Sequence, residues 1–422
     1  MVYVKSIDGQ SLMPTNRHGK IRRLLKSKQA RVIARCPFTI QLLFETGHEV
    51  QDLSLGVDTG SATIACAVTN NHNHIKYLSE VLIRNDITSK MSQRAGYRRA
   101  RRNRKTRYRK TRFLNRKNSI KLGRFSPTMK SKINSHIREI EYVKSILPIK
   151  HLILETGTFD MALMNHENEA FNRHWGYQKG LNYGFKNAQE ATFNRDNYTC
   201  QHCKKHVGTF NAHHIIYRSN GGADTLDNLI ALCEKCHKDL HKGLLSGFES
   251  TLIGKRKGTL KHATQMNSIR LQLLKHYPEA IETFGFVTKE NRQAIGLEKT
   301  HYNDAIVIAL GSIDKPIIEN VNLIVKKHVS KGAYKLANGQ RSEKTLPTGK
   351  IHGFRALDKV SYKGNDYFIS GRMSTGYCTL ANINGEKQVF NNPKTVKLNA
   401  ITRIQARSAT MCINQKTIQN IA

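Results

Sequence analysis

The sequence predicts a mixed α/β protein of about three domains. The number of domains follows from the length, because 422 residues correspond to roughly three units of about 150 residues that each bury a core. Three observations support this prediction. Residues 53–68 have the pattern of an apolar strand, a turn and a second strand, and residues 151–155 that of a buried strand. A unit rich in cysteine and histidine interrupts the chain at roughly residues 190–245. The final residues, from about 326 onward, form short alternating runs separated by Gly and Asn, which is typical of a small β-barrel.

The charge of the chain indicates a polyanionic partner. Lys and Arg number 69 against 31 Asp and Glu, a formal charge of +38, and so much like charge repels itself unless phosphates neutralise it. Nucleic acid is the leading candidate. The rival is an anionic membrane surface, which would require a basic helix with a bulky apolar opposite face. No stretch approaches the roughly 18 apolar residues of a membrane span, and the first residues lack the layout of a secretory signal, so we expect an intracellular protein.

Periodicity predicts several further elements. Residues 17–33 predict a basic amphipathic helix that runs into a strand, and residues 130–148 predict a longer helix. Residues 160–190 are polar and punctuated by Gly, as in a linker or insertion, and helices are expected at residues 264–276 and 300–312. One face of the second helix carries four apolar side chains, Ile133, Ile137, Ile140 and Val143.

Two Cys-x-x-Cys pairs, separated by 29 residues, indicate a metal site rather than disulfides, as is usual in a reducing compartment. Four thiolates in two such pairs make a closed tetrahedral site, which is the structural form of zinc binding. The alternative is that one pair is incidental. The pairs are Cys200 with Cys203 and Cys233 with Cys236, whereas the other cysteines, Cys36, Cys66, Cys378 and Cys412, are scattered singly.

Four histidines and one asparagine between and after the cysteine pairs suggest a second, catalytic metal. His237 and His241 are four residues apart and therefore face the same way on a helix. The spacing resembles the HNH nuclease motif, a β-hairpin and helix around one divalent ion. The resemblance implies that His214 activates water, Asn228 orients the loop of this base, and His213 and His237 hold one Mg²⁺, with His241 as a further candidate ligand. The alternative is a zinc knuckle whose histidines only contact nucleic-acid phosphates.

Acidic residues at predicted strand ends allow three interpretations. Asp58 opens the sequence Asp-Thr-Gly-Ser, which occurs in aspartic proteases, but a second copy is needed and the only echo is Glu-Thr-Gly-Thr at residues 155–158. A phosphate-binding turn of the actin type is the second interpretation. The third joins Asp58, Glu155, His301 and Asp304, whose order and types resemble the RuvC site of a ribonuclease H-like fold. Such carboxylates clamp two Mg²⁺ ions, and His301, one helical turn before Asp304, would activate the water.

The segment at residues 94–117 holds 13 Lys and Arg in 24 residues and no acidic residue. The basic residues recur at helical spacing, so a helix here would be positive on every side and would lie between two nucleic-acid segments. The alternative is a localisation signal or a disordered tail. The candidate nucleic-acid contacts are Arg94, Arg98, Arg99, Arg101, Arg102, Arg104, Lys105, Arg109 and Arg112.

The order of these motifs resembles that of the IscB family of transposon-encoded nucleases, which are similar to compact ancestors of type II CRISPR effectors. Residues 11–33 resemble their N-terminal PLMP domain, Tyr-Gln-Lys-Gly at 177–180 the approach to their HNH unit, residues 296–305 their third RuvC segment, and residues 353–360 their C-terminal domain. The resemblance implies a ribonuclease H-like RuvC core split in three, an inserted ββα-metal HNH domain with zinc knuckles, an arginine-rich bridge helix and a C-terminal β-barrel. It divides the chain into the PLMP-like domain (1–52), RuvC part I (53–90), the bridge helix (91–120), RuvC part II with a linker (121–184), the HNH domain (185–250), RuvC part III (251–325) and a domain that reads the target-adjacent motif (326–422).

RNA guidance is implied by the resemblance alone. A guide (omega) RNA would pair with one strand of a double-stranded DNA target, the HNH site would cut that strand, and the RuvC site would cut the displaced one, with sequence choice left to base pairing. The implied cofactors are two Mg²⁺ in the RuvC site, one Mg²⁺ in the HNH site and one structural Zn²⁺. The implied particle is a monomeric ribonucleoprotein of the prokaryotic cytoplasm. The rivals are a guide-free nuclease and an accessory protein that binds nucleic acid without cutting it.

Overall fold

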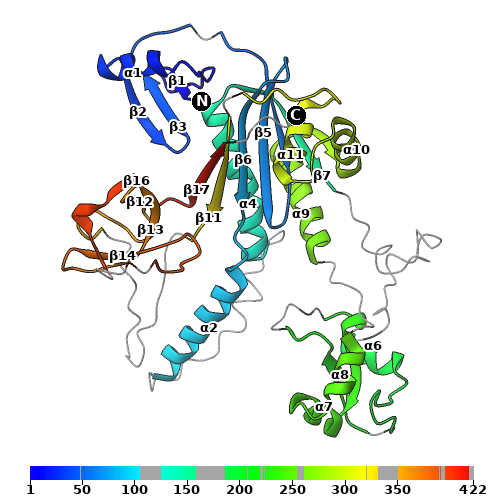
Figure 1. Ribbon diagram of the computed structural model, residues 1–422. Coiled ribbons are helices and arrows are strands. Elements are labelled where there is room, and N and C mark those ends of the chain that lie inside the picture. The colour runs from blue at the N-terminus through cyan, green and yellow to red at the C-terminus, as the bar shows by residue number, and fades with distance from the viewer. Residues whose placement is uncertain are drawn as a thin grey trace. The chain divides into compact units, whose positions relative to one another are not determined.

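The computed structural model describes residues 1–47, 49–104, 125–157, 185, 187–206, 208–218, 222, 224–253, 261–319, 321–330, 350–388, 390 and 395–417 (Figure 1). The chain forms two compact units, one of Met1–Gly157 with Ser268–Ala422 and one of Thr158–Asn267. The prediction of a mixed α/β protein with more than one domain is confirmed, and the chain forms two compact units where about three domains were predicted. Within the described part of the chain, no helix has the length and apolarity needed to span a membrane.

The first unit is built on a seven-stranded sheet (Figure 1). In spatial order its strands are β10 (Ile281–Phe284), β7 (Ile149–Thr156), β4 (Leu53–Asp58), β5 (Thr63–Asn70), β6 (Ile75–Leu82), β11 (Asn322–His328) and β17 (Thr410–Thr417). β4 and β5 form the predicted hairpin, and β4 also pairs with β7 in parallel. Strands predicted at distant positions of the sequence therefore end side by side at one edge of the sheet.

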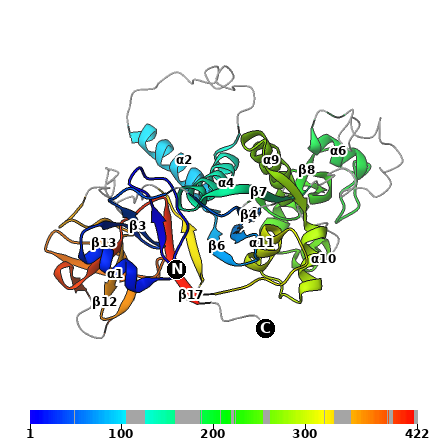
Figure 2. The same cartoon turned by 90° about the horizontal axis from the view of Figure 1, so that it is seen from above.

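Helices α4 (Pro127–Ile146) and α11 (His301–Leu310) cover opposite faces of this sheet (Figure 2). Successive side chains of a strand point to opposite faces, and β6 demonstrates the consequence. Leu78 packs in one hydrophobic cluster with Ala305 of α11, whereas its neighbours Tyr77 and Ser79 donate hydrogen bonds to the buried Glu139 of α4. Both faces of the central strands are thus buried, which agrees with their nearly continuous apolar sequences.

The helices expected from periodicity are all present. α4 begins three residues before the predicted range, and of its four expected apolar residues Ile133, Ile140 and Val143 are buried while Ile137 is half-buried. The remaining helices of the first unit are α1 (His18–Lys26), α2 (Ile87–Arg104) and α10 (Gly285–Ile295), and the boundary between the two units in the chain falls within α9 (Lys261–His276). Of the linker predicted at residues 160–190, residues 158–184 and 186 lie outside the described residues.

Two smaller sheets belong to the first unit. The N-terminal sheet is made of β1 (Tyr3–Lys5), β3 (Phe38–Leu42) and β2 (Ala30–Arg35), in that order, and α1 leads into β2 as the sequence predicts. The C-terminal sheet is antiparallel and ordered β15 (Val396–Lys397), β14 (Tyr377–Ala381), β13 (Asn365–Arg372), β12 (Lys359–Tyr362) and β16 (Thr402–Gln405), with the short helix η4 (Leu398–Ala400) before its last strand. The short strands predicted for the C-terminal part of the chain are therefore confirmed. That this sheet closes into a β-barrel stays a prediction.

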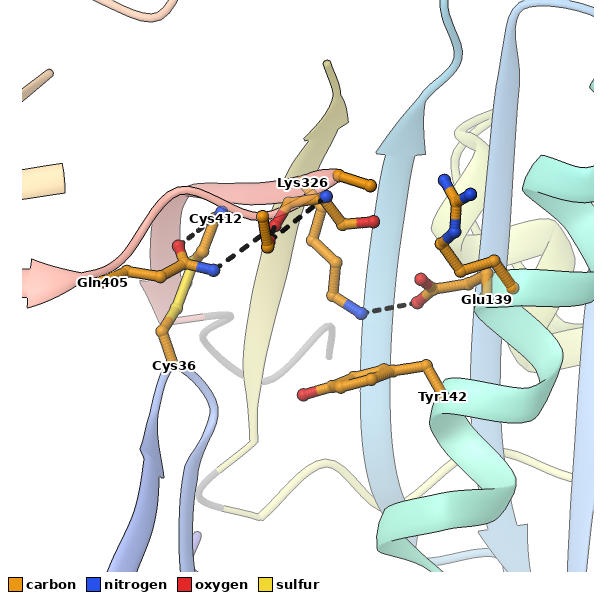
Figure 3. A pocket seen from close by; sticks show the side chains of 10 residues that line it. Cys36, Glu139, Tyr142, Lys326, Gln405 and Cys412 are labelled. Carbon is orange, nitrogen blue, oxygen red and sulfur yellow. Dashed lines mark hydrogen bonds and ion pairs between the residues drawn. A yellow bond between two sulfur atoms is a disulfide. The ribbon is translucent and has the colours of Figure 1, made fainter. Parts of the chain in front are cut away.

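A disulfide between Cys36 and Cys412 joins the end of β2 to β17, across 376 residues of sequence. These two cysteines stand singly in the sequence, and their spacing gives no sign of the pairing. The disulfide borders a cavity of about 320 Å³ between these strands and α4 (Figure 3). Inside it, the Lys326 ammonium lies 2.6 Å from a Glu139 carboxylate oxygen and 4.1 Å from the centre of the Tyr142 ring.

The second unit contains the cysteine- and histidine-rich segment. Its core includes Leu232, Leu240 and Leu252 together with the buried cysteines. Such a small apolar core is typical of domains that depend on a bound metal for stability. Its elements are α6 (Ala188–Arg195), the antiparallel strands β8 (Phe210–His214) and β9 (Leu229–Cys233), the short helix η3 (Leu226–Asn228), α7 (Glu234–His241) and α8 (Ser246–Ile253).

Candidate active sites

Three carboxylates gather at the carboxyl ends of β4 and β7. Asp58 is the last residue of β4 and lies directly opposite Glu155 in the parallel register of the two strands. The Thr59 hydroxyl donates a 2.6 Å hydrogen bond to the Glu155 backbone carbonyl, which ties the two strand ends together. From α11, the Nδ1 atom of His301 lies 2.7 Å from an Asp58 carboxylate oxygen, and Asp304 follows one turn later. The four residues that the sequence analysis grouped from distant segments thus lie at one site. They are Asp58, Glu155, His301 and Asp304.

Gly56 explains how α11 reaches this position. A Cβ atom on Gly56 would lie only 2.3 Å from the Ala309 backbone nitrogen and 2.6 Å from the Ala305 carbonyl oxygen, so the helix packs directly on the strand backbone. The helix itself begins sharply, because the Thr300 side chain accepts a hydrogen bond from the Asn303 N–H. This N-terminus places His301 and Asp304 beside the end of β4.

The surroundings of Glu155 oppose the ionisation of its carboxyl group. Burial raises the pKa of Glu155, the Thr288 side chain opposes this shift, and the neighbouring carboxylates of Asp58 and Asp304 raise the pKa further. The Oε2 atom of Glu155 is buried and has no hydrogen-bond partner among the described residues. The hydrogen bond to Asp58 raises the pKa of His301. A buried carboxylate oxygen without a donor, beside two further carboxylates, fits a divalent cation with oxygen ligands such as Mg²⁺.

Two basic side chains that the sequence analysis did not single out also contact this site. The buried Arg292 of α10 lies 2.9 Å from one Asp304 oxygen, and the largely exposed Lys299 lies 2.5 Å from the other. The three carboxylates are not among the sets of ligand atoms that lie within 4.8 Å of one another in the described structure. Lys299 precedes His301 by only two residues, but nothing in its spacing distinguishes it from the many other lysines.

The four cysteines converge as predicted. The sulfur atoms of Cys200, Cys203, Cys233 and Cys236 all lie within 4.8 Å of one another, and those of Cys203 and Cys233 are 3.9 Å apart. Zn–S bonds of about 2.3 Å in a tetrahedron require sulfur atoms about 3.8 Å apart, so the set fits zinc. Burial opposes ionisation of Cys200, but hydrogen bonds from neighbouring backbone N–H groups lower its pKa to about 7. Deprotonated thiolates are the form that binds zinc.

Three of the predicted histidines form a second cluster of ligand atoms. Ring nitrogens of His213 on β8 and of His237 and His241 on α7 lie within 4.8 Å of one another, and the two Nε2 atoms on α7 are 3.3 Å apart. Burial and the two neighbouring imidazoles lower the pKa of His213 to about 4. Burial also lowers the pKa of His237. Both rings are therefore neutral at physiological pH, as a metal ligand must be.

The fourth histidine is held apart from this cluster. The Nε2 atom of His214 lies 2.6 Å from a carboxylate oxygen of Asp224, and Arg218 bonds to the same carboxylate. These contacts lower the pKa of Asp224. Asn228 fixes the loop that follows His214, because its amide both accepts a hydrogen bond from the Ile216 N–H and donates one to the Ile216 carbonyl. Asp224 was missed by sequence analysis, since a single exposed aspartate in a Gly-rich loop has no distinctive spacing.

The arginine-rich segment begins as the predicted helix. α2 (Ile87–Arg104) carries Arg94, Arg98 and Arg99 in exposed positions. Arg101, Arg102 and Arg104 also lie within this helix. The remaining predicted contacts, Lys105, Arg109 and Arg112, lie outside the described residues. An exposed helix with Arg on successive turns fits phosphate groups.

Two family models match the chain. Residues 2–180 match the model of the RRXRR protein, and residues 98–102 read Arg-Arg-Ala-Arg-Arg. Residues 200–243, which contain the cysteine and histidine clusters, match the model of the HNH endonuclease. The chain is an IscB-like protein. This family membership, expected from the order of the motifs, is confirmed.

Similar curated proteins match only part of the IscB-like chain. "Anaredoxin" from Nostoc sp. is 36% identical over 63 residues, which are 15% of this chain and 83% of that protein. The type IV methyl-directed restriction enzyme EcoKMcrA from Escherichia coli is 42% identical over 50 residues, or 10% of this chain and 18% of the enzyme. Each of these two matches thus covers only a short part of this chain.

Two solved Cas9 structures are weakly similar to the IscB-like chain. Streptococcus thermophilus Cas9 in complex with the AGAA PAM has a TM-score of 0.36 at 12% identity, over 58% of this chain and 32% of that one. The type II-C Cas9 from Actinomyces naeslundii has a TM-score of 0.22 at 11% identity, over 62% of this chain and 60% of that one. The chain spans less than two thirds of EcoKMcrA and of both Cas9 proteins, and likeness at this level assigns no activity.

Proposed function

We propose that this IscB-like protein is an RNA-guided DNA endonuclease with two separate cleavage sites. The observation that carries the proposal is the presence of two chemically different centres, one of carboxylates in the first unit and one of histidines in the second. A guide RNA would pair with one strand of a duplex DNA, the histidine site would cut that strand, and the carboxylate site would cut the displaced strand. The exposed arginines of α2 supply charge for holding two polyanions.

The carboxylate site corresponds in this proposal to a RuvC site on a ribonuclease H-like core split over residues 53–90, 121–184 and 251–325. Asp58, Glu155 and Asp304 would hold two Mg²⁺, which supply charge stabilisation to the attacking and leaving oxygens. His301 acts on the proton of the attacking water. Because its Nδ1–H donates to Asp58, its Nε2 atom is left as the proton acceptor.

The histidine site corresponds to an HNH site within residues 185–250, beside a structural zinc held by the four cysteines. His214 is the general base. Its Nε2–H donates to Asp224, so its Nδ1 atom is left to take the proton from water, and Asp224 keeps the ring in that tautomer. Asn228 positions the loop. The three-histidine set contains no oxygen donor, which fits Mg²⁺ poorly.

The test is strand-specific nicking by the complex of full-length protein, guide RNA and end-labelled duplex. Asp58→Ala should leave only the nick in the guide-paired strand, and His214→Ala should leave only the nick in the displaced strand. Asp52→Ala and His206→Ala are matched controls, since the half-buried Asp52 and the exposed His206 both lie outside the sites. The assignment fails if either active-site variant loses both cuts while the protein remains folded.

RNA that co-purifies with the protein distinguishes the proposal from a guide-free nuclease. Abundant RNA with one defined scaffold supports guidance, whereas cleavage of purified DNA by RNA-free protein contradicts it. A protein that binds RNA and DNA but cuts neither strand under any divalent ion would be a binding protein instead. The domain at residues 326–422 would read the target-adjacent motif.

A further inference from the structure

Two phenylalanines flank the glycine with which α10 begins. The rings of Phe284 and Phe286 are nearly parallel, with 4° between their planes and 6.1 Å between their centres, which is an offset-parallel pair. Phe284 is half-buried at the end of β10, whereas 65% of the Phe286 surface is exposed. Singly exposed apolar side chains are common on protein surfaces, so a function for this ring has to be argued from its place in the fold.

The aromatic pair lies beside the carboxylate site. A Cβ atom on Gly285, between the two phenylalanines, would lie 3.1 Å from a carboxylate oxygen of Glu155. In the parallel register of β10 and β7, Phe284 stands opposite Thr156, one residue beyond Glu155. The start of α10 therefore packs closely on this carboxylate, and the exposed ring of Phe286 belongs to the very next residue of the chain.

The charged groups near the ring indicate which part of a ligand it contacts. Lys289 and Glu290 are exposed one helical turn after Phe286, and their charges oppose each other, so the surface at the ring is not a phosphate site. A cation does lie at the carboxylate site, where the largely exposed Lys299 contacts Asp304. A nucleic-acid strand offers both a charged backbone and the apolar faces of its bases, and it matches this combination of a cation and a ring.

Stacking on an aromatic ring requires a single strand. In a duplex the neighbouring base pairs cover both faces of a base, whereas an unpaired base can turn one face to a protein side chain. Such stacking tolerates any sequence, because every base has a π-face. In the proposed function the carboxylate site cuts the displaced strand, which is unpaired, so the ring and the site require the same substrate. The other class of occupant, a protein partner, would cover the carboxylates that must stay open to the strand.

We propose that Phe286 stacks on one base of the displaced DNA strand, beside the bond that the carboxylate site cuts. The effect on cutting rests on the proposed function, whereas stacking on single-stranded DNA requires no guide RNA. Phe286 is then a positioning residue, because a stacked base restricts the sugar and phosphate next to Glu155. Its loss should slow the nick in the displaced strand and leave the nick in the guide-paired strand unchanged.

Photochemical crosslinking tests the contact without any activity. Full-length protein is mixed, without Mg²⁺, with single-stranded DNA that carries iodouracil, irradiated and digested, and the crosslinked peptide is identified by mass spectrometry. We expect a crosslink in the peptide that contains Phe286, and its loss in Phe286→Leu, which keeps an apolar side chain without a flat ring. Ile313→Ala is the matched control and should retain the crosslink, because Ile313 is also 65% exposed but follows the far end of α11.

Abasic sites in the displaced strand separate stacking from other effects of the substitution. In the complex of protein, guide RNA and duplex target, the wild-type nick is mapped and the bases beside it are removed one at a time. Phe286→Ala should slow this nick by roughly 5- to 150-fold, the range for loss of one stacked base, whereas Phe286→Trp should preserve the rate. One abasic position should slow the wild type by a similar factor and Phe286→Ala no further, because both changes remove the same contact.

Several results would overturn the proposal. They are a wild-type rate in Phe286→Ala, equal slowing of both nicks, or factors that multiply when the abasic site and Phe286→Ala are combined. A smaller particle mass of Phe286→Ala in light scattering would show that the ring binds a protein, which also overturns it. If the crosslink to Phe286 forms but the protein cuts neither strand, the stacking inference stands and the proposed function fails.

Discussion

Adding one methyl group at Gly56 tests whether close packing of α11 on β4 sets the geometry of the carboxylate site. The Cβ of Gly56→Ala would lie 2.3 Å from the Ala309 nitrogen, whereas ordinary contact begins at 3.4 Å. The helix must therefore move by about 1.1 Å, the difference between these distances. If that movement falls along the 2.7 Å contact of His301 with Asp58, the atoms separate to about 3.8 Å, beyond hydrogen-bond range.

The expected effects are of two kinds. Overpacking of this sort lowers the free energy of unfolding by about 1–3 kcal/mol, which chemical denaturation will measure. A misplacement of about 1 Å in a catalytic geometry lowers rates by about 100-fold, so we expect this loss for nicking of the displaced strand only. Gly19→Ala is the control, because a Cβ there meets no atom within 4 Å. A folded Gly56→Ala protein that nicks the displaced strand at the wild-type rate would refute the reasoning.

Three further predictions concern stability and metal content. Lys326→Met leaves the buried Glu139 carboxylate without its cation and should lower the free energy of unfolding by about 3–5 kcal/mol. Replacing both Lys326 and Glu139 by Met should recover most of that loss. If the losses of the two single variants simply add up in the double variant, this prediction is wrong. Cys200→Ser removes one of four thiolates and should release the structural zinc, seen as one ion fewer per chain and a lower melting temperature. Because the pKa of His301 is raised above its ordinary 6.5, its pairing with Asp58 contributes stability fully present below pH 6.5 and lost as the pH rises through the folded-state pKa. Thermal melts from pH 5 to 9 should show this slope in the wild type and a flatter profile in Asp58→Asn.

Sequence analysis predicts best what a short segment determines by itself. The spacing of Cys200 and Cys203 leaves few geometries for their thiolates, and two histidines four residues apart on one helix must face the same way. The β4–β5 hairpin and the helix α4 follow from local periodicity in the same sense. In contrast, the disulfide of Cys36 with Cys412 depends on where β17 enters the sheet, which no local pattern encodes.

The partners of the candidate site residues are harder to predict for a related reason. Asp224 and Lys299 are exposed, charged residues in a chain with many others, and only the folded backbone brings them to His214 and Asp304. Arg292, on a different helix, is buried against Asp304. The residue type alone does not distinguish a buried arginine of this kind from a solvated one. Charge composition predicts the class of ligand, whereas the pairing of individual charges requires the fold.

The carboxylate site lies between these extremes, and the topology of the sheet explains why. Asp58 and Glu155 stand directly opposite each other only because β7 returns to pair in parallel with β4, although 96 residues separate the side-chain hydroxyl of Thr59 from the Glu155 carbonyl it bonds to. Parallel pairing brings the carboxyl ends of two strands to the same edge, so acids at both ends must meet once the pairing exists. The sequence shows the acids at predicted strand ends, but only the resemblance of their order to a known site suggests that these two strands are neighbours. It follows that variants which disturb the β4–β7 pairing should affect the carboxylate site as a whole, whereas variants in the second unit should leave it unchanged.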